Sequence, residues 1–435
     1  MAFNFYKGES GMGIENSDTT GPNLPWAGKK VDTADVEVEL SHLWRLSADN
    51  VRISHNINIR TSVLNFVICT QDIEAARWAS ALIRDLSSTH IARLILLVLD
   101  TSSSKAPGVS SWVTLRSFPI VSDLMRHHFE QVTLLLSGDA INSAATIMQP
   151  LFKPDLPVYL WWLQDLPGGG PVFSRLADVS SRVIIDSNNF ADPEQGISTV
   201  STLIRELPNS GALSDLNWGR ITPWRQLVAQ FFDSPEYKPY LAGINRIEIE
   251  YAVAASDETA SGASGQTASP NPIRSWLMAG WLKTSLNWRL VEESPYNLYD
   301  PISGTYSWQV SRTTGPLSVE PVSGAHRTGK LGFSGQGSIH IRPHIQTTPD
   351  NGALRLIRLT SVVNNHQAVF TIHRKEDNAD YVITSVEQTQ ATLPQRAVGL
   401  STTHEESELL HDELEITGRD YLYESTLHEV FELIT

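Results

Sequence analysis

The chain has 435 residues, of which 41% are hydrophobic, and a formal net charge of -15 from 48 acidic and 33 basic residues. This length exceeds what one compact core usually holds, so we expect two domains, and the acidic balance gives no electrostatic basis for binding nucleic acid or an anionic membrane. No stretch approaches the roughly 20 apolar residues that a spanning helix needs, and the N-terminus lacks an apolar signal core, so we expect a cytoplasmic protein.

From residue 36 to residue 253 the chain alternates between helical and extended patterns, after a first 35 residues that we expect to form a flexible tail. The extended segments are nearly continuous apolar runs, which are typical of strands buried on both faces. We expect strands at 63–69, 91–100, near Val113, and at 132–136, 158–163, 183–185 and 244–253, with helices at 36–47, 72–87, 140–151, 172–179 and 193–207. Repeated βα units predict a Rossmann-like α/β domain over 36–253, with a doubly wound, mainly parallel sheet that the strand at 244–253 also joins.

A segment rich in Ser, Gly, Ala and Thr at 254–272 predicts a flexible linker or loop. Beyond it we expect an α+β domain over 273–435, made of mostly antiparallel strands and helices. The predicted strands lie at 306–310, 338–342, 353–362, 368–373 and 381–386, and two acidic helices at 405–417 and 419–434 follow, separated at Gly418. In the helix that begins at Ile273, Gly280 allows close packing with another helix.

The most informative stretch is the proline-bracketed run at 154–167, which contains the adjacent residues Trp161 and Trp162. Its central residues predict a buried strand, so Gln164 and Asp165 should lie at the carboxyl edge of the sheet, where open α/β sheets bind ligands. The next residues are Leu-Pro-Gly-Gly-Gly-Pro, which carry no catalytic signature. The position is one where function is expected, but the residues of a known chemistry are missing.

Motifs for nucleotide, acyl-transfer and zinc chemistry are missing elsewhere too. The first βα turn, Cys-Thr-Gln-Asp at 69–72, has none of the glycines that admit a dinucleotide, and we expect Asp72 to cap the helix that follows. The glycines at 168–170 could form a phosphate loop, but the Lys-Ser/Thr pair is missing. The acids that follow predicted strands could bind a metal or catalyse proton transfer, although acids are also ordinary helix caps there: Asp100, Asp139, Asp165 and Asp186. We predict no cofactor and no metal.

Tryptophan is abundant, with 12 residues, and many lie near the proposed domain junctions. Large aromatic side chains with one polar edge suit protein interfaces, and core packing between domains is the alternative. A helix should begin at Thr222, as its N-cap, with Pro223 at the first helical position. The candidate interface or junction residues are Trp161, Trp162, Trp218, Trp224, Arg225 and Trp281.

Several blocks resemble the OpcA family, the glucose-6-phosphate dehydrogenase assembly proteins of cyanobacteria and actinobacteria. They are Leu-Pro-Val-Tyr-Leu-Trp-Trp at 156–162, Asp-Leu-Asn-Trp-Gly-Arg-Ile-Thr-Pro-Trp-Arg at 215–225, Ala-Gly-Trp-Leu at 279–282 and Leu-His-Asp-Glu-Leu-Glu-Ile-Thr-Gly-Arg-Asp-Tyr-Leu-Tyr-Glu at 410–424. The resemblance implies a non-catalytic cytoplasmic partner of glucose-6-phosphate dehydrogenase that favours its active oligomer as an allosteric activator. A sugar-phosphate-binding protein or enzyme, using the carboxyl edge of the first sheet, is the alternative.

The family resemblance also bears on the single cysteine, Cys69, because cyanobacterial members are associated with thiol-linked regulation. One cysteine cannot close an internal disulfide, so redox control would need Cys69 with another chain, or a thiol of the dehydrogenase. From its apolar surroundings we expect an inert core thiol, and a partly exposed, redox-sensitive thiol at the strand end is the alternative.

Overall fold

The computed structural model describes residues 24, 26, 28–54, 57–59, 62–86, 92–101, 107–119, 125–166, 170–207, 211–254, 270–291, 294–295, 297–312, 335–346, 351–376, 378, 380–388, 391–392, 395–400 and 406–435. The chain divides into two compact units. Unit 1 comprises Met1–Gln164, Gly169–Ile185 and Leu207–Ala212, and unit 2 comprises Asp165–Gly168, Asp186–Glu206 and Leu213–Thr435. No helix within the described ranges is long and apolar enough to cross a membrane.

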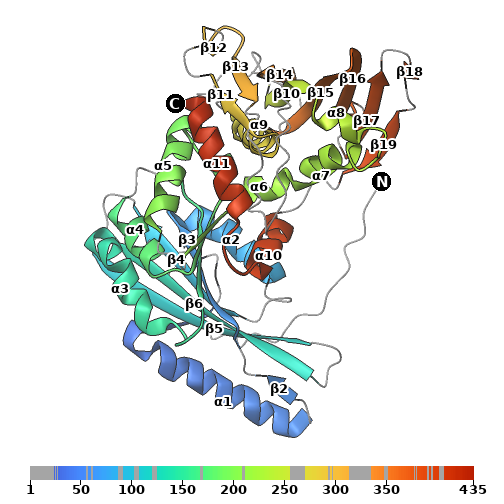
Figure 1. The fold of residues 1–435 in the computed structure, drawn as a ribbon. Helices are drawn as coiled ribbons and strands as arrows, with labels where there is room; N and C mark the ends of the chain where they lie inside the picture. Colours follow the sequence, from blue (N-terminus) through green and yellow to red (C-terminus); the bar gives the residue numbers. More distant parts are fainter. Residues whose placement is uncertain are drawn as a thin grey trace, which may run out of the picture. The chain divides into compact units, whose positions relative to one another are not determined.

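The first sheet has the strand order β1-β5-β6-β4-β3-β7-β8-β9, with β2 paired to β6. Strands β3, β4, β6 and β5 are labelled in Figure 1. The strands are β1 Lys29–Val31, β2 Ile57–Ile59, β3 Leu64–Thr70, β4 Ala92–Asp100, β5 Gly108–Pro119, β6 Met125–Ser137, β7 Val158–Trp162, β8 Arg182–Ile185 and β9 Ala212–Asp215. The pairs β3–β4, β3–β7, β4–β6 and β7–β8 are parallel, and β5 runs antiparallel to both β6 and β1. The predicted mainly parallel sheet is confirmed.

The sheet is doubly wound because its connections run in opposite directions. Helix α2, Ile73–Leu86, connects β3 to β4, whereas α4, Pro171–Asp178, connects β7 to β8 on the other side of the strand order. Right-handed crossovers therefore put α2 and α4 on opposite faces. Every residue of β3, β4 and β7 is buried, as strands between two helical layers require. The switch in direction falls between β3 and β7.

Unit 1 also contains a buried ion-pair network that fastens α1, Val36–Ser54, to the sheet. The Nη2 atom of Arg93 lies 2.7 Å from Oε2 of Glu130, and both side chains are nearly fully buried. Arg93 also pairs with Glu37 of α1, and the indole of Trp44, further along the same helix, donates to Glu130. Removing one partner would leave an uncompensated buried charge, which typically costs about 3–5 kcal/mol. Among the described residues, the other helical segments before β7 are α3, Ala144–Met148, and short 3-10 turns.

The second sheet, wholly in unit 2, has the order β11-β13-β14-β10-β15-β16-β17-β18, with β12 paired to β13 and β19 to β17. Its strands are β10 Ile244–Ala254, β11 Trp288–Leu290, β12 Leu298–Asp300, β13 Thr305–Arg312, β14 Gln336–Gln346, β15 Leu354–Val363, β16 His366–Arg374, β17 Tyr381–Gln388, β18 Ala391–Thr392 and β19 Arg396–Gly399. The pair β10–β14 is parallel, and β10–β15, β13–β14, β15–β16 and β16–β17 are antiparallel. The predicted unit of mostly antiparallel strands and helices is confirmed.

Strand β10 is a correction, because we predict from the sequence that 244–253 joins the first sheet. It lies instead in the middle of the second sheet, between β14 and β15. Its side chains alternate in a way that suits a sheet covered on one face: Ile247 and Ile249 are buried, whereas Arg246 is exposed and Glu248 is half-buried. The alternation was sufficient to predict a strand, but it carries no information on the strand's neighbours.

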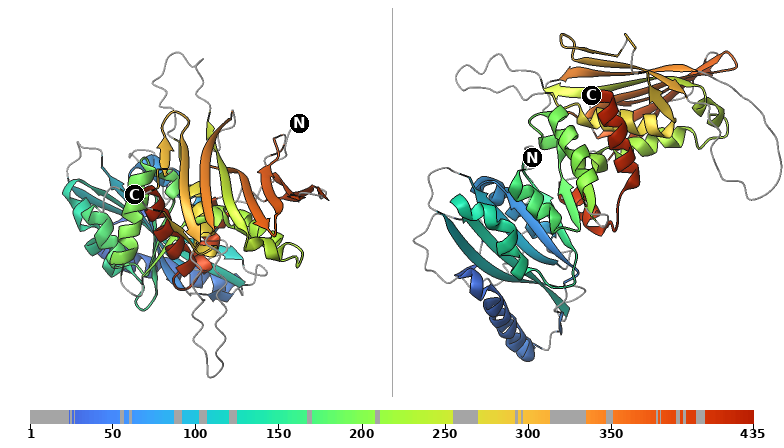
Figure 2. Two further views of the ribbon diagram at one scale, coloured as in Figure 1. Left: turned by 45° about the horizontal axis from the view of Figure 1, so that its top comes forward. Right: turned by 60° about the vertical axis from the view of Figure 1, so that its left-hand side comes forward.

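Helices cover one face of the second sheet (Figure 2). They include α7 Thr222–Phe231, α8 Lys238–Leu241 and α9 Ile273–Ser285, which contact β16, β15 and β10 respectively. Behind them lie α5 Pro193–Glu206, α6 Leu216–Arg220, α10 Glu406–Glu415 and α11 Tyr421–Ile434, where α11 packs on both α5 and α9. Thr222 is not the N-cap of α7, which is Ile221: α6 runs almost directly into α7, so the Thr222 hydroxyl donates to the carbonyl of Trp218 at 3.2 Å.

Helices α9 and α11 approach closely at Gly280, as the sequence predicts. A Cβ at Gly280 would lie 2.7 Å from Val430 Cγ2 and 2.8 Å from the backbone oxygen of Thr426. These separations leave no room for a side chain, so the absence of a Cβ sets the distance between the two helices. Gly418, between α10 and α11, has a φ of 89°, which is a backbone conformation that glycine adopts without strain.

Candidate functional site

The switch point between β3 and β7 is where an open α/β sheet places its ligand. The residues just beyond the two strands bind each other there. The Gln71 side chain donates from Nε2 to Oε1 of Gln164 at 2.8 Å, and Gln164 Nε2 lies 3.8 Å from Sγ of Cys69. The two amides thus bridge the carboxyl ends of β3 and β7 within unit 1.

The N-terminus of α2, which follows this turn, is capped by Asp72. Its Oδ1 accepts a hydrogen bond from the Ala75 N–H at 2.7 Å, as the sequence predicts. In a dinucleotide-binding fold, free amides at this helix end receive the pyrophosphate. A carboxylate now satisfies the helix end, and its negative charge would repel a phosphate.

Cys69 ends up in the core of unit 1, with no exposed surface. Burial raises the pKa of its thiol, because the surrounding apolar groups disfavour the thiolate. The thiolate is the reactive form of cysteine, so this environment slows both oxidation and disulfide exchange. A redox role for Cys69 stays a prediction.

The predicted acids at the carboxyl edge lie in different surroundings. Asp139 is exposed and Asp165 is half-buried, whereas Asp100 and Asp186 are buried. Within the described ranges, no group of three or more His, Cys, Asp and Glu side chains could hold a metal ion. Of the triple glycine, residues 168 and 169 lie outside the described residues, and Gly170 is the N-cap residue of α4.

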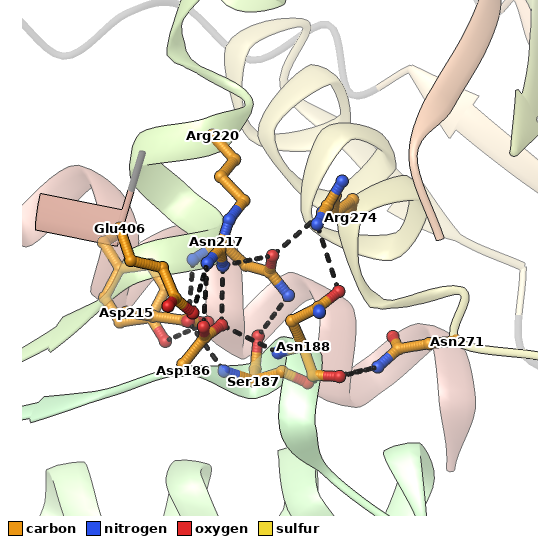
Figure 3. Close-up of polar contacts among 10 residues, drawn as sticks. Asp186, Ser187, Asn188, Asp215, Asn217, Arg220, Asn271, Arg274 and Glu406 are labelled. Atoms are coloured by element: carbon orange, nitrogen blue, oxygen red, sulfur yellow. Dashed lines mark hydrogen bonds and ion pairs between the residues drawn. The ribbon is translucent and has the colours of Figure 1, made fainter. Parts of the chain in front are cut away.

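Asp186 belongs to a polar cluster that follows β8 and β9, and we call it the strand-end cluster (Figure 3). All its members belong to unit 2. The side chains point toward one another from β9, α6, α9, α10 and the turn after β8. The cluster consists of Asp186, Ser187, Asn188, Asp215, Asn217, Arg220, Asn271, Arg274 and Glu406.

Three carboxylates, those of Asp186, Asp215 and Glu406, form the acidic side of the strand-end cluster. Arg220 binds Asp186 through both of its terminal nitrogens, at 2.6 Å and 2.8 Å, and its Nη2 lies 3.5 Å from Glu406. Asp215 Oδ1 accepts from the backbone N–H groups of Ser187 and Asn217, each at 3.0 Å. The second oxygen of Asp215 accepts from the phenol of Tyr423 at 3.3 Å.

Amides and a second arginine complete the strand-end cluster. Asn217 donates to the Ser187 hydroxyl at 2.9 Å and accepts at its Oδ1 from Nε of Arg274, also at 2.9 Å. Arg274 reaches Asn188 Oδ1 at 3.1 Å, and Asn271 donates to the Asn188 carbonyl at 3.0 Å. The described polar groups thus bind one another, and the cluster ties α6, α9 and α10 to the strand ends.

The pKa values of the cluster follow from its burial. Burial raises the pKa of Asp215 to about 6, and the charge of Asp186 adds to that shift. Burial and Asp186 together raise the pKa of Glu406 to about 7, although Arg220 opposes them. Burial disfavours the charge of Arg220, but Asp186 and Glu406 outweigh it and raise the pKa of Arg220. The two acids therefore favour the charged form of Arg220, whereas burial favours the protonated form of Glu406.

The predicted tryptophans of unit 1, Trp161 and Trp162, are almost completely buried, with exposed fractions of 0% and 3%. Trp161 packs against Trp78, and Trp162 against Phe173 of α4, at ring-centroid distances of 5.6 Å and 4.9 Å. Side chains with so little exposed surface cannot contact a partner directly. Any effect that they have on binding would pass through the packing of the sheet.

The predicted residues of unit 2 lie around α6 and α7. The Trp218 indole donates to Asp420 at 2.8 Å, and the Arg225 guanidinium lies 3.5 Å from the centroid of the Trp218 ring. Burial lowers the pKa of Arg225 to about 10, against the influence of Asp420. Trp224 is buried, and Trp281 on α9 is half-buried.

The strand-end cluster was largely missed by sequence reasoning, which singled out Asp186 alone among its members. Asp215, Asn217 and Arg220 occur together directly after a strand, within a block that we examined mainly for its tryptophans. Three polar residues so close to a strand end were a signal for this site. Arg274 and Glu406 carry no such signal, because they lie far from these strands in the sequence and only the tertiary structure brings them to the cluster.

The structure thus defines a protein with a Rossmann-like α/β sheet, in which the protein's own side chains bind one another at the edge where such sheets place a ligand. Its second sheet is covered by helices on one face. The chain belongs to the OpcA family. Residues 83–202 match the family described as glucose-6-phosphate dehydrogenase subunit N-terminal domain, and residues 211–427 match its C-terminal counterpart.

Curated relatives carry the name OxPP cycle protein OpcA. The protein of Synechocystis sp. is 29% identical over 165 residues, which are 38% of this chain and 31% of the relative. The protein of Nostoc punctiforme is 31% identical over 178 residues, which are 41% of this chain and 33% of the relative. The matched segment spans about a third of the length of these relatives.

Solved structures that resemble the chain are oxidoreductases. Glucose-6-phosphate 1-dehydrogenase from Mycobacterium avium has a TM-score of 0.47 and 12% identity, covering 86% of this chain and 91% of the other. Levoglucosan dehydrogenase has a TM-score of 0.38 and 12% identity, covering 87% of this chain and 89% of the other. Similarity at this level carries no argument about function.

Proposed function

We propose that this chain is a non-catalytic assembly factor that binds glucose-6-phosphate dehydrogenase and favours its active oligomer, in the oxidative pentose phosphate pathway of the cytoplasm. The observation that carries the proposal is the Asp72 cap at the start of α2, at the sheet edge where dinucleotide-binding sheets hold the phosphates of their ligand. The names of the matched family and of its curated relatives support the choice of partner.

The electrostatics at this edge favour a structural role over catalysis. A helix N-terminus attracts anions with roughly half a positive charge, and here the Asp72 carboxylate already uses that attraction. A bound phosphate would have to displace the Asp72 side chain from the helix N-terminus, or else lie within a few ångströms of its negatively charged carboxylate. The Gln71 and Gln164 side chains also bind each other, so these amides are already hydrogen-bonded at the position where a ligand would need them.

The alternative, a sugar-phosphate-binding protein or enzyme, would use the acids at the strand ends. Asp186 and Asp215 are committed to bonds with Arg220, Ser187 and Asn217 inside unit 2. A ligand would have to break these bonds, and replacing buried charge-assisted hydrogen bonds costs free energy. We therefore prefer the assembly factor.

An activator changes the dehydrogenase only through a difference in affinity. If the chain bound the active and inactive oligomers equally, it would shift neither population, however tightly it bound. The proposal accordingly requires that the chain binds the active oligomer more tightly. That preference should appear as a rise in activity that saturates with the concentration of the chain.

Enzyme kinetics test the proposed function. The purified chain is titrated into the dehydrogenase at a glucose 6-phosphate concentration below the KM, with the heat-unfolded chain as control. We expect a saturable rise in rate that the control does not produce. Unchanged kinetics would argue against activation, and oxidation of glucose 6-phosphate by the chain alone, with a nicotinamide cofactor, would contradict the non-catalytic role.

A further inference from the structure

The second sheet presents one face that no described helix of unit 2 covers, and we call it the open face (Figure 2). It is formed by the outward residues of β10, β14 and β15 in the middle of the sheet, and the charged or ionisable ones among them include Arg246, Glu248, Glu250, His340, Arg342, His344 and Arg358. These side chains lie across from one another in register: Glu248 is paired with Arg358 of β15, and Glu250 with Arg342 of β14. The open face is therefore polar and ordered by strand pairing.

Each carboxylate of the open face lies beside basic side chains. Glu248 lies 2.9 Å from Arg246 and 3.6 Å from Arg358. Burial opposes the charge of Glu248, but these arginines outweigh it and lower the pKa of the carboxyl group. Glu250 pairs with Arg342 and lies 3.9 Å from the His344 ring. Two carboxylates thus face three arginines and a histidine.

The balance of charged groups on this face differs from that of the whole chain, whose formal net charge is -15. The open face also contains a shallow depression of about 620 Å³ where β15, β16 and β17 follow one another. Its lining adds Arg355, Arg374 and Lys375 to the cations, and Glu376 and Glu387 to the acids. Cations are not outnumbered on this face, although acids outnumber them over the whole chain.

We propose that the open face docks the chain onto an acidic surface of its dehydrogenase partner. The inference rests on the proposed function, and it adds which surface of this chain binds the dehydrogenase and which charge the bound surface of the dehydrogenase carries. Arg246 and Arg342 are about half exposed, with exposed side-chain fractions of 50% and 53%, so each can bind a second carboxylate from a partner. Arginine is suited to this role because its guanidinium group carries five N–H donors, so a pair with one glutamate leaves donors for another acceptor.

A second copy of the chain is a poorer occupant of the open face. Closed dimers bring the same patch of both copies together across a twofold axis. That arrangement would bring the exposed arginines of both copies toward one another, and like charges across an interface disfavour the pairing. An acidic surface on the partner would instead attract the exposed arginines of the open face.

The test neutralises two exposed arginines, as Arg246→Gln with Arg342→Gln, in the full chain. The matched control is Lys29→Gln with Arg77→Gln in unit 1, because these cations are each 53% exposed and each pair with one glutamate. Affinity for the dehydrogenase is measured by interferometry at low and at moderate salt, with the thermal midpoint of each variant. We expect the open-face variant to lose about tenfold or more in affinity and part of its salt dependence, and the control to retain both.

The outcomes separate the docking surface from the proposed function. Equal loss in both variants, or no loss in the open-face variant while the unmodified chain binds, would overturn the docking surface alone. Failure of the unmodified chain to bind would overturn it together with the proposed function. A change in the chain's own oligomeric mass with unaltered dehydrogenase binding would assign the face to self-association and so reject the proposal.

Discussion

Replacing Gly280 by alanine should destabilise unit 2, although alanine normally favours helices. The new Cβ would lie 2.7 Å from Val430 Cγ2 and 2.8 Å from the Thr426 oxygen, well inside van der Waals contact. Because one of these atoms is backbone, a rotamer change cannot relieve both clashes, and α9 must move away from α11. Such overpacking costs about 3 kcal/mol at the upper end of its range, and the gain in helix propensity returns about 1 kcal/mol. We expect a net loss of about 2 kcal/mol in the free energy of unfolding.

The assay is thermal unfolding followed by circular dichroism, in which this loss corresponds to a fall in Tm of about 4–8 °C. Gly219→Ala is the matched control, because its Cβ would meet a single atom, Leu409 Cδ2, at 3.0 Å at the end of a flexible side chain. We expect the Tm of that variant to change by less than about 2 °C. A Gly280→Ala chain that is as stable as the unmodified protein, or more stable, would refute the close helix contact.

Other predictions concern titration, reactivity and packing. The pKa of Glu406 is raised from 4.5 to about 7 in the folded chain, so its contribution to stability is full below about pH 4.5 and lost as the pH rises through about 7. Glu406→Gln should therefore flatten the fall in urea midpoint between about pH 5 and about pH 8, and an unchanged slope would contradict this assignment. Cys69 should react slowly with a thiol reagent in the native chain and rapidly in denaturant, since burial raises its pKa; rapid native reaction would disprove its burial. Trp224→Ala should cost about 3–5 kcal/mol of unfolding free energy, and a loss below about 1 kcal/mol would show that the site is not core.

Local periodicity was sufficient to predict the central strands of the first sheet and the helices between them, but it did not predict β1, β2 or β9. The apolar run before Cys69 and the helical spacing after Asp72 predicted β3 and α2 within one residue, and the acid at the helix start predicted the cap. The close packing at Gly280 was predicted from local sequence too, because a glycine beside the apolar line of a helix allows another helix to approach.

Long-range partners could not be predicted in this way. The pattern of 244–253 was sufficient to predict a strand, but its place in the second sheet depends on pairing with β14 and β15, about a hundred residues further along the chain. The strand-end cluster likewise combines Asp215 with Arg274 and Glu406. Their contacts follow from the positions of α9 and α10, which local propensity does not determine.

The most direct test of the account is the mass of the dehydrogenase with and without this chain, measured by sedimentation at matched concentrations. The account predicts a complex heavier than either protein, in which the dehydrogenase occupies its active oligomer at concentrations where it otherwise dissociates. Sedimentation of the two proteins as separate species, with the dehydrogenase distribution unaltered, would contradict the claim that this chain is its assembly factor.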